Sequence, residues 1–240
     1  CIINYYIMLP THIFTNGCSF LTSRPKEGVD THVGVELEKL LGLKPARHLA
    51  GGGRGNRRCS VTTKVWCENN QELAEKCFFV IGITSGQRFD FPSMDGYKKH
   101  KFPELNSAWR SYKPHINTHT EKFFKYLVNT GNVDLDEMIQ YESIEATLSL
   151  QNYFKVKKYP YVMYKTISDP PIKKRKSDVE TLFQSIDTTR YYKPNSSHKD
   201  YTEENNQHCS PDDWHPSAIG HKDWATQLKD FIDANNLRTI

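Results

Sequence analysis

The stretch "CFFVIGIT", residues 77–84, decides the fold. It is a continuous apolar run with the length of a single strand, and the first polar side chain comes only at Thr84. A strand without alternating polar residues is buried on both faces, as happens in the middle of a parallel sheet. The run therefore predicts the central strand of an α/β domain.

The segments around this strand alternate between strand-like and helix-like patterns. "THIFTNG" (11–17) and "ARHLAGGG" (46–53) predict two further strands, and "YPYVMYKTI" (159–167) predicts a fourth. Apolar residues at helical spacing predict helices between and after them, at about 33–41, 56–69, 117–129, 134–152 and 177–186, with a last helix starting near Pro216. This alternation implies a parallel sheet covered by helices on both faces. We expect a three-layer α/β/α fold with a mostly parallel central sheet, in a single domain over residues 8–237.

Two segments do not follow the alternation. Residues 85–115 collect aromatic and basic side chains without periodicity, which predicts an excursion off the sheet that could form a lid or a substrate wall. Residues 190–211 are polar and predict a loop.

Composition limits the class of protein. The chain has 240 residues and a net charge of +4, which is too weakly basic to indicate nucleic-acid binding by itself. No apolar run approaches the ~20 residues of a membrane helix, and the N-terminus is a poor signal peptide whose residues 1–7 could precede the natural start.

The six cysteines include no close pair, so free thiols and a cytoplasmic location are expected. His208, Cys209 and His215 form only a weak metal candidate, and no cofactor is expected.

Polar clusters follow three of the predicted strands. They are Ser19 in "NGCSF", the glycines of "GGGRGN" (51–56) and the end of "VIGIT". In open parallel sheets, ligands bind outside the carboxyl ends of the strands. The three clusters therefore predict one site at this edge of the sheet.

A fourth cluster, "DDWH" (212–215), comes just before the last helix. A serine hydrolase needs a base that takes the serine proton and a carboxylate that orients the base. His215 and Asp212 could supply both from one loop, with Asp213 as the rival carboxylate. Other readings make Ser19 a helix cap, Cys18 the nucleophile, or His221 a surface residue of the last helix.

In their order, these blocks resemble the SGNH (GDSL-type) hydrolase superfamily, and are closest to a divergent "NGCSF"-bearing branch in phages and environmental bacteria. The resemblance implies that Ser19 is the nucleophile, His215 the base and Asp212 the acid. It also implies an oxyanion hole made by Ser19, Gly55, Asn56 and Thr84. In this chain Thr84 stands where the family has an asparagine, and Cys18 stands where it has an aspartate.

The resemblance implies hydrolysis or transfer of an acyl ester, with deacetylation of a carbohydrate as one form, and a location in a virion or host cytoplasm if a phage encodes the chain. Arg88, Arg54 and Ser85 are candidate substrate contacts on a small-molecule or carbohydrate ester. The alternative is a non-catalytic SGNH-like domain that binds a glycan or a protein. A nucleic-acid interface would rest only on "KKRK" (173–176) and "RGNRR" (54–58), and an exposed basic loop is the favoured explanation of the former, because charge runs usually face solvent.

Overall fold

The computed structural model describes residues 9–92, 109–112, 118–131, 133–169 and 177–239. The expectations for residues 1–7 and for "KKRK" lie outside the described residues.

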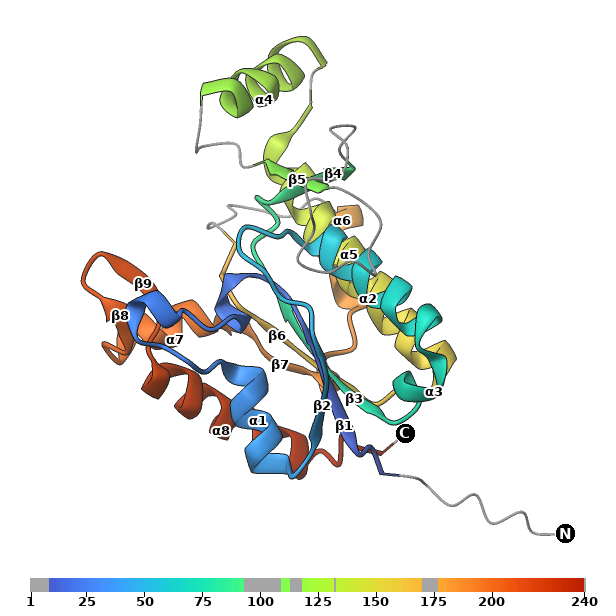
Figure 1. Cartoon of the computed structure of the whole chain (residues 1–240). Helices are drawn as coiled ribbons and strands as arrows, with labels where there is room; N and C mark the ends of the chain where they lie inside the picture. The colour runs from blue at the N-terminus through green and yellow to red at the C-terminus, as the bar shows by residue number, and fades with distance from the viewer. Residues whose placement is uncertain (1–8, 93–108, 113–117, 132, 170–176, 240) are drawn as a thin grey trace, which may run out of the picture.

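The centre of the molecule is a five-stranded parallel sheet (Figure 1). Its strands, in spatial order, are β2 (Lys44–His48), β1 (His12–Asn16), β3 (Cys77–Ile83), β6 (Tyr161–Lys165) and β7 (Tyr191–Ser197). The apolar run around residue 80 is the middle strand, as its composition predicted. Along the chain this order is second, first, third, fourth, fifth, so the winding direction reverses between β1 and β3, which is where such folds form their crevice.

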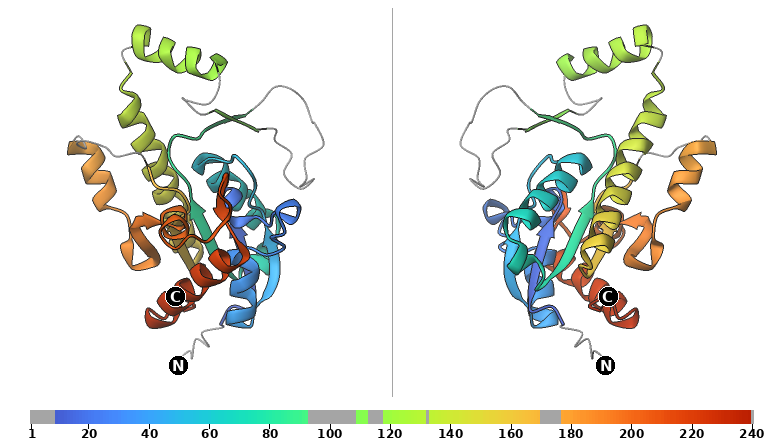
Figure 2. Two further views of the ribbon diagram at one scale, coloured as in Figure 1. Left: turned by 90° about the vertical axis from the view of Figure 1, so that its left-hand side faces the viewer. Right: turned by 90° about the vertical axis from the view of Figure 1, so that its right-hand side faces the viewer.

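Helices cover both faces of the sheet (Figure 2). On one face lie α2 (Asn56–Asn69), α3 (Gln71–Ala74), α5 (Leu135–Lys157) and α6 (Ser177–Gln184). On the other face lie α1 (Val33–Leu41) and α8 (Ala218–Ala234). Side chains of β3 alternate between these two cores, with Phe79 and Ile81 in the first and Phe78 and Val80 in the second. The predicted three-layer α/β/α fold is confirmed.

The predicted excursion contains regular structure. Strands β4 (Phe89–Pro92) and β5 (Trp109–Tyr112) pair as an antiparallel hairpin, and α4 (Thr118–Gly131) follows. A small separate core joins Phe89 to Phe124 of α4 and Ile139 of α5. Residues 93–108 and 113–115 of the excursion lie outside the described residues.

The prediction of a polar loop at 190–211 was wrong. This segment contains β7, α7 (His198–Glu204) and β8 (His208–Ser210), and β8 pairs with β9 (Asp213–Pro216). Strand β7 lies at the edge of the sheet, where a proline inside a strand is tolerated. A capping box between Ser197 and Asp200 then starts α7.

The last helix begins two residues later than predicted. Pro216 ends β9, and the Ser217 side chain caps the helix by accepting a hydrogen bond from the Gly220 N–H. His221 is fully buried, so its assignment to the surface was wrong. Among the described helices, none is long and apolar enough to cross a membrane.

Candidate active site

Ser19 lies immediately beyond the carboxyl end of β1, as the first residue of the 3-10 helix η1 (Ser19–Leu21). The Asn16 side chain fixes the turn: its Oδ1 accepts from the Gly17 N–H, and its Nδ2 donates to acceptors on α2. A Cβ on Gly17 would lie 2.9 Å from the Gly82 carbonyl oxygen of β3. Gly17 therefore lets the Ser19 turn cross close to the central strand.

Cys18, next to the nucleophile candidate, points into the protein. It is fully buried, and its Sγ lies 3.1 Å from the Thr166 hydroxyl. The structure contradicts the alternative in which Cys18 is the nucleophile.

Ser19, His215 and Asp213 form a hydrogen-bonded triad. The Ser19 Oγ lies 2.9 Å from His215 Nε2, and His215 Nδ1 lies 2.6 Å from Asp213 Oδ1. His215 and Asp213 both lie on β9, which pairs with β8 (Figure 1) and contacts η1, although Ser19 is 196 residues from His215 in the sequence. The structure thus brings together the serine and the histidine that the sequence singled out.

Asp212 is not the carboxylate of this triad, which corrects the prediction. Asp212 is exposed in the turn before β9, whereas Asp213 lies within the strand. Side chains two residues apart in a strand share a face, so Asp213 and His215 meet while Asp212 does not. The acid and the base are thus two residues apart on a strand, whereas the prediction placed them three residues apart on a turn.

Sequence reasoning missed Arg24, which holds the carboxylate. Its Nη2 donates to Asp213 Oδ2 at 2.6 Å and also contacts Glu27. Asp213 therefore accepts from His215 at one oxygen and from Arg24 at the other. No local motif around Arg24 signals this role, because its partner is 189 residues away.

The charges of the triad suit a general base. Burial lowers the pKa of His215 below its usual 6.5, and the positive charges of Arg24 and Arg88 lower it further, against the raising effect of Asp213. Burial raises the pKa of Asp213, but hydrogen bonds from His215 and the charge of Arg24 outweigh it, so the net shift is downward. At neutral pH the imidazole is neutral and the carboxylate is ionised.

Two of the predicted oxyanion donors are occupied. The Gly55 N–H donates to Asp90 Oδ2 at 2.7 Å. The Asn56 amide exchanges two hydrogen bonds with the Thr84 backbone, both 2.8 Å, and its Nδ2 also faces the Ser143 hydroxyl. These groups tie the start of α2 to β4 and to the end of β3, so the prediction that they donate to an oxyanion was wrong for this conformation.

The other two predicted donors are available. The Ser19 N–H is at the first position of η1 and has no acceptor among the described residues. The Thr84 Oγ1 is buried and likewise lacks a partner among them. Ser19 and Thr84 follow neighbouring strands, β1 and β3, at the edge where the crevice is expected.

The three predicted substrate contacts differ in their surroundings. Arg54 is buried and folds back onto its own loop, where it donates to the Leu49 carbonyl. The Ser85 hydroxyl accepts from the Gln87 N–H within its turn. Arg88 is buried near the triad and has no carboxylate partner among the described residues. Among the described residues, Arg88 retains side-chain N–H donors without an acceptor, which makes it the best placed of the three to bind a substrate.

Aromatic rings enclose the base. The Trp214 ring stacks on His215 at 5.3 Å and 19°, and Phe20 packs against His215 from η1 with a centroid distance of 5.1 Å. Trp214 is 40% exposed, so it presents an apolar surface beside the triad.

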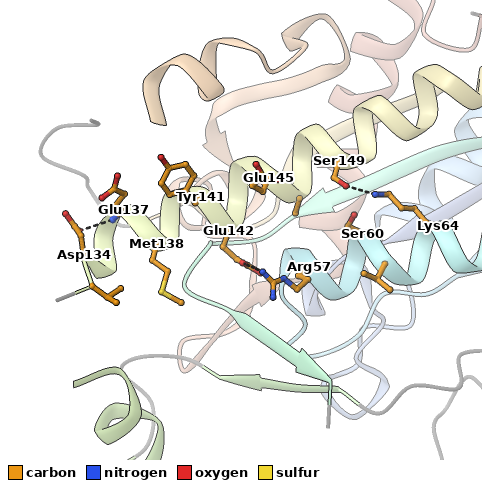
Figure 3. Close-up of a pocket in the computed structure, with 13 residues that line it drawn as sticks. Arg57, Ser60, Lys64, Asp134, Glu137, Met138, Tyr141, Glu142, Glu145 and Ser149 are labelled. Atoms are coloured by element: carbon orange, nitrogen blue, oxygen red, sulfur yellow. Dashed lines mark hydrogen bonds and ion pairs between the residues drawn. The ribbon is translucent and has the colours of Figure 1, made fainter. Parts of the chain in front are cut away.

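A separate cavity of about 590 Å³ lies between α2 and α5 (Figure 3). Its lining includes Arg57, paired with Glu142, and Lys64, which donates to Ser149. It contains no residue of the triad.

The described part of the chain offers no group of three His, Cys, Asp or Glu side chains arranged to hold a metal ion. The weak candidate formed by His208, Cys209 and His215 therefore fails, since both ring nitrogens of His215 are engaged within the triad.

The chain matches no protein-family model, and a search of curated proteins finds no significant relative.

Proposed function

We propose that the protein is a serine hydrolase of the SGNH type that cleaves an acyl ester. The observation that carries the proposal is the triad itself, with 2.9 Å between Ser19 Oγ and His215 Nε2 and 2.6 Å between His215 Nδ1 and Asp213 Oδ1. A hydroxyl, a base within hydrogen-bond reach and a carboxylate that orients the base are the requirements of nucleophilic acyl transfer.

In the proposed reaction, Ser19 Oγ attacks the ester carbonyl carbon while its proton passes to His215 Nε2. The Ser19 N–H and the Thr84 hydroxyl are the proposed donors to the resulting oxyanion. Collapse breaks the bond to the alkoxide, which takes the proton from His215, and leaves an acyl group on Ser19. Water then attacks this acyl group with His215 again as base, releasing the carboxylic acid; an alcohol in place of water would give acyl transfer.

The experiment is hydrolysis of 4-nitrophenyl acetate by the wild type and by Ser19→Ala, with fluorophosphonate labelling and mass spectrometry of the adduct. We expect turnover and a label on Ser19, both lost in the variant. A wild type that shows neither would contradict the proposal.

A non-catalytic SGNH-like binding domain is the second candidate. The observation that favours it is the loss of two oxyanion donors, because the Gly55 N–H and the Asn56 amide bind other groups. Absence of label and of turnover, together with binding of a glycan or protein that Ser19→Ala leaves intact, would support this reading. For both candidate functions, the ligand that we propose is an acetylated carbohydrate, which the resemblance suggests.

A further inference from the structure

Arg88 is a buried cation whose charge the described residues do not neutralise. It is 7% exposed, and the only hydrogen bond of its side chain among them runs from Nη1 to the Arg54 carbonyl at 3.4 Å, close to the limit for such a bond. No described carboxylate lies within ion-pair distance. An arginine that is largely buried and has no carboxylate partner needs an explanation.

Arg88 lies in the turn between β3 and β4, on the side of the triad. Its backbone N–H donates to the Ser85 carbonyl at 3.3 Å. A Cβ added to Gly55 would lie 2.1 Å from the Arg88 carbonyl oxygen, so the two backbone segments are in close contact. This packing fixes the backbone. Together with burial, the Arg88 charge acts to lower the pKa of His215, so the guanidinium is within electrostatic reach of the base.

The nearby carboxylates already have other partners. Asp213 accepts from His215 and Arg24, and Asp90 accepts from the N–H groups of Gly55 and Arg58. Arg24 adds a second positive charge close to His215. Because Arg24 pairs with Asp213 and Glu27, Arg88 is the cation beside the triad whose charge no described carboxylate offsets, and this charge favours an anionic ligand.

We propose that Arg88 binds a carboxylate group of the ester substrate and so selects anionic esters. The guanidinium is planar and presents paired N–H donors that match the two oxygens of a carboxylate. This inference rests on the proposed ester hydrolysis, and it adds the class of substrate. In the bound state the carboxylate would supply the missing acceptor and hold the ester carbonyl near Ser19.

The test compares matched esters that differ only in charge. One pair, 4-acetoxybenzoate and 4-acetoxybenzamide, varies the alcohol part. The other pair, mono-4-nitrophenyl succinate and 4-nitrophenyl succinamate, varies the acyl part. We expect the wild type to prefer the anionic ester in at least one pair. Arg88→Gln should reduce that preference, measured as the ratio of kcat/KM values, about tenfold through KM, the size expected for a charged hydrogen bond.

Two variants serve as controls. Arg88→Lys keeps the charge and should restore part of the preference. Arg57→Gln removes an exposed arginine of α2 that pairs with Glu142 of α5, and it should leave the ratio unchanged. Equal ratios in the wild type and in Arg88→Gln, or no preference for an anion in either pair, would overturn the inference while leaving ester hydrolysis in place.

A binding measurement separates this inference from the proposed function. By calorimetry, Ser19→Ala should bind 4-acetoxybenzoate more tightly than 4-acetoxybenzamide, and the double variant with Arg88→Gln should lose the difference. This result would support the anion site even if the wild type hydrolysed no ester. Equal binding of the two compounds would overturn it.

Discussion

At the scale of single residues, the neighbouring carboxylates Asp212 and Asp213 make a matched pair. Asp213 accepts from His215 Nδ1 at 2.6 Å, whereas Asp212 is exposed. In Asp213→Asn the amide would favour the wrong tautomer of the imidazole, so we expect kcat for 4-nitrophenyl acetate to fall by about 10³–10⁴. Asp212→Asn should stay within about twofold of the wild type, as surface substitutions usually do.

Circular dichroism of both variants controls for folding. A fall of kcat in Asp212→Asn, with the kcat of Asp213→Asn unchanged, would mean that the β8–β9 hairpin presents Asp212 to His215 when substrate is bound. It would restore the assignment that the sequence favoured.

These residues also show what local sequence can predict about the site. Ser19 and His215 stand next to predicted element ends, and the structure brings them into contact. The identity of the acid depends on whether residues 213–216 are strand or turn, and four residues carry too little periodicity to decide. Gly55 and Asn56 were misjudged because their partners, Asp90 and the Thr84 backbone, are 28 to 35 residues away.

At the scale of elements, the contact between Gly17 and Gly82 sets the path of the chain from β1 to η1. A Cβ on Gly17 would lie 2.9 Å from the Gly82 carbonyl oxygen and 3.3 Å from its Cα, and backbone atoms cannot move aside. We expect Gly17→Ala to lower the free energy of unfolding by about 1–3 kcal/mol, the usual cost of overpacking. Urea unfolding followed by circular dichroism measures this change.

Gly52→Ala is the matched control. A Cβ there would meet nothing within 4 Å, so its unfolding free energy should stay within about 0.5 kcal/mol of the wild type. If Gly17→Ala is as stable as Gly52→Ala, the backbone at Gly17 and Gly82 can move apart to make room for a methyl group, which this packing does not imply.

The strands of the central sheet were predictable to different degrees. β3 is buried at every position, so its composition alone identifies it. β7 contains Pro194 and polar residues because it is an edge strand, and its sequence resembles a loop. The β8–β9 hairpin is short and partly exposed, and its position is fixed by packing on η1 and α7, which no local pattern records.

At the scale of the whole molecule, three buried histidines from different elements should make the fold sensitive to acid. Burial lowers the pKa of His32 to about 3 and that of His221 to about 4, in the second case against the raising effect of Glu36, and it lowers the pKa of His198 well below its usual value. All three are neutral in the folded chain near pH 5, whereas the unfolded chain, with pKa values near 6.5, binds protons there. Their stabilisation is complete above about pH 6.5 and is lost as the pH falls towards the folded pKa values.

We therefore expect the free energy of unfolding to fall between pH 7 and 5, approaching about 1 kcal/mol per pH unit for each buried histidine at the acidic end. Urea unfolding at half-unit steps of pH measures the slope. Neither ring nitrogen of His221 has a hydrogen-bond partner among the described residues, so His221→Leu should fold, and its slope should be smaller by the contribution of one histidine, about 1 kcal/mol per pH unit at the acidic end. An unfolding free energy that is flat from pH 7 to 5 would mean that these histidines gain protons without unfolding, through local opening of the layer formed by α1 and α8.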